Sequence, residues 1–113
     1  SAMQGVIASQ FELDKYKTQD KNSKEISNFV LFIEDAKSAD LKNGLNRGQI
    51  IGDSMNFTRD LANEPPNILT PTEMANRAKA MAKEAGLKYE VLDEAKMEKL
   101  GMGSLMSVSR GSE

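Results

Sequence analysis

Two adjacent prolines, Pro65 and Pro66, constrain the fold of this 113-residue chain more than any other feature. Proline has no backbone N–H and clashes with the preceding helical turn, so a helix cannot continue through this pair. The residues just before the prolines are pushed towards extended conformations. The chain must therefore contain separately terminated elements joined by a stiff turn, and this turn sets the direction in which the second element leaves.

The stretch before the prolines, from about residue 38 to residue 62, has the pattern of one long helix. Apolar residues recur at steps of three and four, and Gly44, Gly48 and Gly52 lie four residues apart. Each glycine costs a helix interior about 1 kcal/mol relative to alanine. Because a face without side chains lets another backbone approach, we expect a neighbouring helix or sheet to pack tightly there. A membrane dimer motif is not supported, because charged residues of the same helix would lie in lipid.

A second helix is predicted to begin soon after the prolines. Thr70 is the expected N-cap and Pro71 the first helical residue, while Glu73 would complete a capping box with Thr70. Gly86 is expected to end this helix in a left-handed conformation. The predicted buried stripe of the helix consists of Met74, Ala78, Met81 and Ala85.

Three stretches predict β-strands. Residues 29–33 form a continuous apolar run rich in β-formers, typical of a strand buried on both faces. Residues 10–13 would form a weak neighbouring strand, and residues 87–91 alternate apolar and charged side chains.

Two further elements are expected towards the end of the chain. Asp93 would cap a short helix that turns Met97 and Leu100 inward and ends at Gly101. Residues 102–110 fit either a short helix or a strand. The predicted fold class is α/β: an incomplete fragment with a long linker helix, a second capped helix and a few short strands.

Composition removes several kinds of chemistry. The chain contains no cysteine and no histidine, so disulfides, zinc–thiolate sites, a cysteine nucleophile and a Ser-His arrangement are excluded. The net charge of −2, with both signs interspersed, does not favour a nucleic-acid-binding surface. No apolar run approaches the roughly 20 residues of a membrane span, and Ser1-Ala2-Met3 is typical of a tag remnant.

The remaining polar motifs are better explained by local structure than by catalysis. The carboxylate pairs Glu12/Asp14, Glu34-Asp35 and Asp93-Glu94 lie at predicted element ends, where solvated side chains or helix caps are expected. Ser107 and Ser109 have no base to activate them, and the glycines at 101 and 103 lack the lysine and spacing of a phosphate loop. Arg59 and Asp60 could form a buried ion pair or face solvent. The residues alone supply no catalytic or metal-binding set.

The segment Arg59-Asp60-Leu61-Ala62-Asn63-Glu64-Pro65-Pro66-Asn67 resembles the R-D-L-x-N-x-P-x-N segment of the leucyl aminopeptidase family (peptidase family M17). Residues 50–61 resemble the linker helix of that family. Residues 70–75, 91–94 and 100–112 are similar to the start of its catalytic domain, and residues 11–17 to the end of its N-terminal domain. The resemblance implies domain limits at 4–37 (N-terminal domain), 38–69 (linker helix and Pro-Pro turn) and 70–113 (catalytic α/β domain), after residues 1–3.

The resemblance also implies a function for the parent protein. Members are cytoplasmic, hexameric metallo-aminopeptidases that remove N-terminal residues from peptides with two divalent metals, zinc or manganese. Their metal ligands include an N-T-D-A-E-G-R motif, which this chain lacks, so the resemblance assigns it no catalytic residue, no metal ligand and no cofactor. Its partners would be the rest of the catalytic domain, other copies and, for the parent, the peptide substrate. What transfers is a structural joint (Arg59, Asp60, Asn63, Pro65, Pro66, Asn67) and a helix cap (Thr70, Glu73).

A second interpretation stays open at this point. The chain could be a stand-alone protein-interaction module without enzymatic activity, packing on a partner through its methionine- and glycine-rich faces. A gene that continues past Glu113 into N-T-D-A-E-G-R would favour the aminopeptidase fragment. A reading frame that ends there would favour the module.

Overall fold

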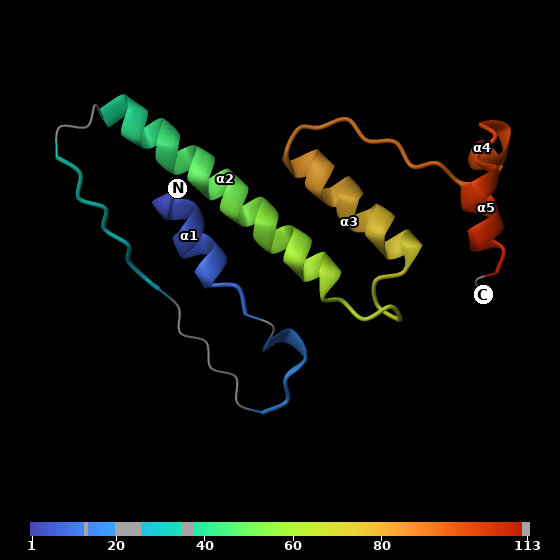
Figure 1. Cartoon of the computed structure of the whole chain (residues 1–113), viewed down its shortest axis with the longest axis horizontal. Helices are drawn as coiled ribbons and strands as arrows, with labels where there is room; N and C mark the ends of the chain where they lie inside the picture. The colour runs from blue at the N-terminus through green and yellow to red at the C-terminus, as the bar shows by residue number, and fades with distance from the viewer. Residues whose placement is uncertain (13, 20–25, 35–37, 112–113) are drawn as a thin grey trace. The chain divides into compact units, whose positions relative to one another are not determined.

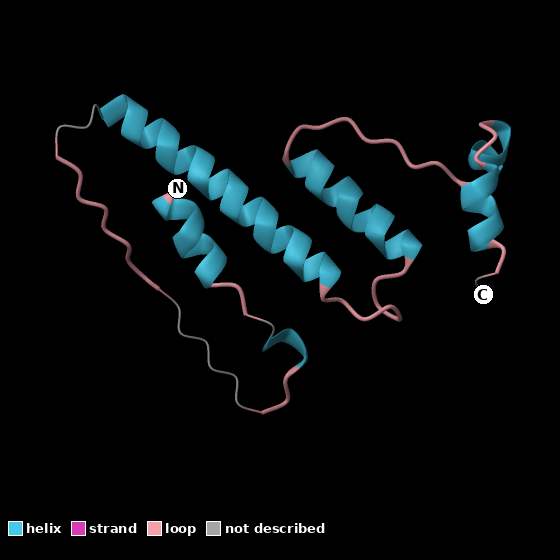
Figure 2. Ribbon diagram, in the orientation of Figure 1, coloured by secondary structure: helices cyan, strands magenta, loops and turns pink. Residues whose placement is uncertain are grey.

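The computed structural model describes residues 1–12, 14–19, 26–34 and 38–111. The chain divides into two compact units, Ser1–Ile68 and Leu69–Glu113 (Figure 1), and each is described by itself. Every regular element among the described residues is helical, and no strand occurs in these ranges (Figure 2). The predicted α/β class is therefore wrong.

The first unit is a pair of helices side by side. It contains α1 (Ala2–Ser9), a 3-10 turn η1 (Asp14–Tyr16) and the long helix α2 (Ser38–Ala62). The bounds predicted for α2 from its periodicity are confirmed. Helix α1 lies along α2 (Figure 1) and was not predicted. It begins with a capping box between Ser1 and Gln4, which stabilises the start of a helix too short to persist by propensity alone.

The glycine face of α2 is where α1 packs. A Cβ added at Gly52 would lie 2.8 Å from Ile7 Cβ, and one added at Gly48 would lie 3.0 Å from Met3 Cβ. Both distances are too short for a methyl group, so α1 sits directly on the backbone of α2. The expected close packing is confirmed at these two positions. At Gly44 an added Cβ would meet nothing within 4 Å.

The two strands predicted in this unit are not present. Gln10 caps the end of α1 with a helical backbone conformation, residues 11 and 12 belong to no strand, and Leu13 lies outside the described residues. Residues 29–33 have no regular structure, and all five side chains are exposed. A strand is stable only with neighbours that share its backbone hydrogen bonds, and no described segment supplies that ladder. The apolar composition was read correctly, but the buried strand inferred from it was wrong.

The second unit holds three shorter helices: α3 (Pro71–Glu84), α4 (Glu94–Lys99) and α5 (Gly103–Ser109), of which α4 and α5 pack together. Gly86 ends α3 at a φ of 67°, and Gly101 ends α4 at a φ of 71°. Both stops have the backbone pattern of a Schellman motif, as the bond from Leu87 N–H to the Ala82 carbonyl at 2.7 Å shows for α3. The left-handed stop predicted at Gly86 is confirmed, as is the end of the short helix at Gly101, whose positive φ was not predicted.

Burial in this unit differs from the sequence expectation. Ala82 and Met106 are the buried apolar residues, whereas Met74, Met81 and Leu100 are exposed. Residues 87–91 form no strand, because no described segment pairs with them. The open alternative at residues 102–110 resolves as helix α5. No helix within the described ranges is long and apolar enough to cross a membrane.

Candidate functional site: the joint between α1 and the end of α2

Two side chains of α2 cap the end of α1. Asn56 Nδ2 donates to the Ile7 carbonyl at 2.9 Å, and Arg59 Nη1 donates to the Ala8 carbonyl at 3.0 Å. The Ile7 carbonyl also accepts from the Gln10 N–H at 3.2 Å. Because the last carbonyls of a helix lack the usual partner within it, Arg59 satisfies an Ala8 carbonyl that a short helix would otherwise leave to water. The guanidinium also places a positive charge at the negative end of the α1 dipole.

Arg59 has a second role beyond this cap. Its guanidinium carbon lies 5.6 Å from the centre of the Phe11 ring, within the range of a cation–π contact. One arginine therefore contacts both the end of α1 and Phe11, two residues beyond it. The sequence alone allowed two alternatives for Arg59 and Asp60, a buried ion pair or side chains that face solvent. Neither describes Arg59, which is half-buried against the N-terminal segment and forms no ion pair with Asp60.

A buried carboxylate, that of Glu64, lies two residues beyond the end of α2. Lys15 Nζ and Tyr16 OH donate to the two carboxylate oxygens of Glu64, whose side chain is only 2% exposed. These hydrogen bonds to Glu64 are the main reason that the pKa values of Lys15 and Tyr16 are raised above 10.5 and 10.0 respectively. Beside the pair is a cavity of about 30 Å³, which Glu12, Lys15, Tyr16, Asp60, Asn63 and Glu64 line.

The turn that follows is closed by its own hydrogen bonds. Asn63 donates to the Arg59 carbonyl from both its backbone N–H, at 3.0 Å, and its side-chain amide, at 2.7 Å. The Ile68 N–H then donates to the Pro65 carbonyl at 2.9 Å, which closes a turn around Pro66 and Asn67. The two hydrogen bonds from Asn63 thus fix the last turn of α2 before Pro65.

The start of α3 is capped by Thr70. Its hydroxyl accepts from the Glu73 N–H at 3.3 Å, and Pro71 occupies the first turn. The Glu73 carboxylate accepts from Arg77 Nε at 2.9 Å. The reciprocal bond of a capping box is replaced by an (i, i+4) ion pair, so half of the expected box forms.

Several other polar residues singled out in the sequence have local partners, and Asp35 lies outside the described residues. Asp93 caps α4 by accepting from the Lys96 N–H at 2.8 Å, and Asp14 pairs with Lys17. The hydroxyls of Ser107 and Ser109 donate to backbone carbonyls of their own helix. Within the part of the chain that the structure describes, no three Asp, Glu, His or Cys side chains come together in a way that could hold a metal ion.

Sequence reasoning missed the residues by which α2 and the turn after it contact the N-terminal segment. Asn56 and Glu64 carried no recognisable signal, because their partners are 48 or 49 residues away in the chain. One usable sign was the glycine spacing on α2, which predicted that something approaches this helix closely. It did not say that the partner is the N-terminal segment.

Comparison with known proteins places the second half of the chain in a described family. Residues 56–113 match the model of the cytosol aminopeptidase family, catalytic domain. The match begins within α2, at the first of the residues that cap α1.

Curated relatives match nearly the whole chain. A probable cytosol aminopeptidase of Solibacter usitatus (strain Ellin6076) is 45% identical over 112 residues, which are 99% of this chain and 22% of the relative. A probable cytosol aminopeptidase of Alkaliphilus oremlandii (strain OhILAs) is 41% identical, over 98% of this chain and 23% of the relative. The cytosol aminopeptidase of Pseudomonas aeruginosa (strain PAO1) is 42% identical over 91% of this chain and 21% of its own length. The chain thus spans about a fifth of the length of these relatives. No solved structure gave a significant match.

Proposed function

The chain belongs to the cytosol aminopeptidase family, and we propose that it is a segment of a longer enzyme that removes N-terminal residues from peptides. In this proposal the whole protein works in the cytoplasm, uses two divalent metal ions (zinc or manganese) and assembles as a hexamer. The observation that carries it is the family match to residues 56–113, which the relatives extend over nearly the entire chain. Coverage of about a fifth of those relatives fits a segment.

The described residues do not fit the metal pair. Such metals take carboxylate or imidazole ligands in close groups, and the chain has no histidine and no carboxylate cluster of three among its described residues. We therefore assign no step of hydrolysis to this chain and propose that it is inactive alone. When bound elsewhere in the protein, such metals would polarise the scissile carbonyl and activate water.

We propose that this segment acts as a joint. Residues 4–37 would end an N-terminal domain, residues 38–69 would form the linker, and residues 70–113 would open the catalytic domain. The physical basis is local: Arg59 and Glu64 bind the N-terminal segment, so the last turn of α2 is fixed where the chain enters Pro65 and Pro66. A joint held in this way supplies rigidity without contributing a reacting group.

The proposal is tested on the longer protein that contains this chain. We expect the purified protein to release p-nitroaniline from leucine p-nitroanilide, to lose this activity on chelation and to recover it with manganese or zinc. A matched substrate blocked at its amino group (N-acetyl-leucine p-nitroanilide) controls for endopeptidase contamination, since an aminopeptidase needs the free amine. A longer protein that folds but hydrolyses neither leucine p-nitroanilide nor other free-amine peptides with either metal would overturn the proposed function.

A further inference from the structure

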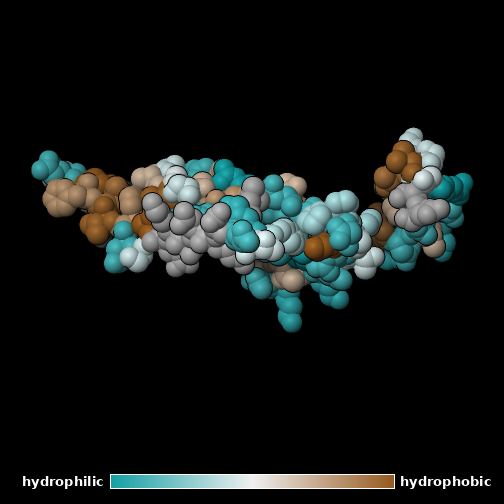
Figure 3. Space-filling view, turned by 90° about the horizontal axis from the view of Figure 1, so that it is seen from below, coloured by the Kyte–Doolittle hydropathy of each residue, from teal (hydrophilic) through white to brown (hydrophobic). Residues whose placement is uncertain are grey.

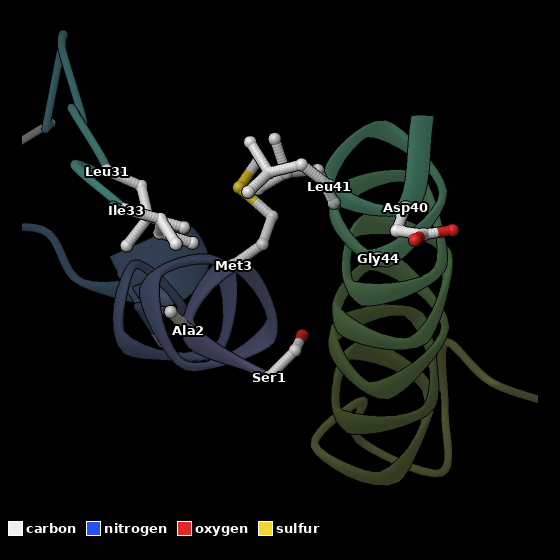
Figure 4. Close-up of a pocket in the computed structure, with 9 residues that line it drawn as sticks. Ser1, Ala2, Met3, Leu31, Ile33, Asp40, Leu41 and Gly44 are labelled. Carbon is white, nitrogen blue, oxygen red and sulfur yellow. The ribbon is translucent and has the colours of Figure 1, made fainter. Parts of the chain in front are cut away.

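One buried polar contact of the first unit lies entirely within this chain. The hydrophobic surface seen in Figure 3 and the apolar pocket of about 450 Å³ beside α1 and α2 (Figure 4) are faces that the rest of a longer protein can cover. The Glu64 side chain is already only 2% exposed. Further chain can only deepen this burial, and both partners of the carboxylate, Lys15 and Tyr16, belong to the chain itself.

The contact joins the part of the chain that matches the catalytic domain to residues outside that match. The match begins at residue 56, so Glu64 lies inside it, whereas Lys15 and Tyr16 come well before it. Both donors belong to one 3-10 turn, η1. Lys15 donates to one carboxylate oxygen and Tyr16 to the other. A carboxylate held at both oxygens is fixed in orientation as well as in position.

The charges around Glu64 make its ion pair with Lys15 act as a unit. The cavity beside the pair is lined by three carboxylates, those of Glu12, Asp60 and Glu64, and by the Lys15 ammonium. Removing one partner of a buried ion pair leaves an uncompensated charge, whereas removing both partners can be nearly neutral. Substitutions of Lys15 and Glu64 should therefore have non-additive effects.

Glu64 directly precedes the stiff part of the joint. Pro65 restricts Glu64 to extended conformations, and each proline fixes its own φ. The Ile68 N–H then closes a turn on the Pro65 carbonyl at 2.9 Å. Because the torsions of the prolines are fixed and the turn after them is hydrogen-bonded, a displacement of Glu64 is passed on to the chain that follows.

We propose that Glu64 is a positioning residue for the peptide hydrolysis assigned to the longer protein, an inference that rests on the proposed function. Held by Lys15 and Tyr16, its carboxylate fixes the place where the catalytic domain begins. It acts through the backbone that follows it and not by contact with the substrate. Catalytic groups need their productive geometry to within about 0.5 Å, and a misplacement of about 1 Å can lower the rate about 100-fold.

The first test measures hydrolysis of leucine p-nitroanilide by the longer protein. We expect Glu64→Gln and Lys15→Met each to lower kcat about tenfold and to leave KM within about twofold. The double variant should also lose about tenfold, and not the roughly 100-fold of independent changes. The matched control is Glu12→Gln, which removes the same charge from an exposed side chain beside the same cavity and should leave kcat unchanged.

A smaller folded fraction would also lower the apparent kcat, so two further readouts separate it from misplacement. The metal content per chain and the circular dichroism spectrum of each variant should match those of the wild type. Where Glu64→Gln does not fold, Tyr16→Phe takes its place, because it removes one donor to Glu64 without changing the charge. Its kcat should fall about threefold.

Hydrogen exchange followed by mass spectrometry gives a readout that does not depend on turnover. In Glu64→Gln the peptide that contains the Ile68 amide should exchange about tenfold faster, while a peptide from the middle of α2 should exchange as in the wild type.

The outcomes separate this inference from the function on which it rests. A longer wild-type protein without activity would remove both. An active wild type with a fully active Glu64→Gln variant would remove this inference alone. The same holds for an equal loss of kcat in Glu12→Gln, for losses that multiply in the double variant, and for unchanged exchange at Ile68.

Discussion

The contact between α1 and the glycine face of α2 makes a prediction that separates packing from helix propensity. Replacing Gly52 with alanine adds a methyl group 2.8 Å from Ile7 Cβ and 2.9 Å from Ile7 Cγ2. Since Cβ is attached directly to the backbone, rotation of the Ile7 side chain cannot remove the overlap, and α1 has to move. Replacing Gly44 with alanine adds the same methyl group to the same helix with nothing within 4 Å.

The expected sizes follow from two effects of opposite sign. Alanine stabilises a helix interior by about 1 kcal/mol relative to glycine, and this applies equally at both positions. Overpacking costs about 1–3 kcal/mol and applies at Gly52 alone. We therefore expect Gly44→Ala to stabilise the first unit by about 0.5–1 kcal/mol. The opening free energy of the first unit in Gly52→Ala should be about 1–3 kcal/mol lower than in Gly44→Ala.

Amide hydrogen exchange by NMR is the appropriate measurement, because it reports the opening free energy of α1 separately from the second unit. Gly52→Ala should lower the protection of α1 amides, whereas Gly44→Ala should raise it or leave it unchanged. Equal changes in the opening free energy of α1 for the two variants would refute the packing described here.

Three other predictions follow from the joint and the cap. Arg59→Ala leaves the Ala8 carbonyl, near the end of α1, without its charged donor, so α1 amides should lose about 1–2 kcal/mol of protection by hydrogen exchange. Thr70→Ala should destabilise α3 by about 1 kcal/mol in exchange or thermal melting, whereas Thr72→Ala, beyond the N-cap, should have a smaller effect. In a Tyr89→Phe background the absorbance titration of Tyr16 should have its midpoint above 10.0, because its hydroxyl donates to a buried carboxylate.

The titration also predicts how the contact depends on pH. The pKa values of Lys15 and Tyr16 are raised in the folded state above their ordinary values of 10.5 and 10.0. The stabilisation from each contact with Glu64 is therefore fully present at pH values below its ordinary pKa, and it is lost as the pH rises through the raised pKa of the folded state. Glu64→Gln removes the negative charge and should return the Tyr16 midpoint towards 10.0. An unchanged midpoint in Glu64→Gln would show that the carboxylate is not the cause.

Sequence reasoning succeeded where structure is decided locally. The limits of α2 follow from its apolar spacing and the two prolines. The stop at Gly86 follows from glycine's tolerance of a φ of 67°. The N-cap at Thr70 is a contact between neighbours in the chain, as is the cap at Asp93.

It failed where the outcome depends on partners distant in the chain. Residues 29–33 have the composition of a strand, but composition cannot supply the neighbour that a ladder requires. Helix α1 was missed because its first residues were set aside as a tag remnant. Glu73 shows the limit on a smaller scale, since Arg77 competes for the carboxylate that the capping box would use.

The central claim is that this chain is a non-catalytic joint of an aminopeptidase, and one measurement tests it most directly. The 113-residue chain and the longer protein are assayed side by side with leucine p-nitroanilide, at equal molar concentration, with manganese or zinc. The longer protein should release p-nitroaniline, and the chain alone should match the buffer blank. Metal-dependent turnover by the chain alone, retained on repurification, would contradict the account.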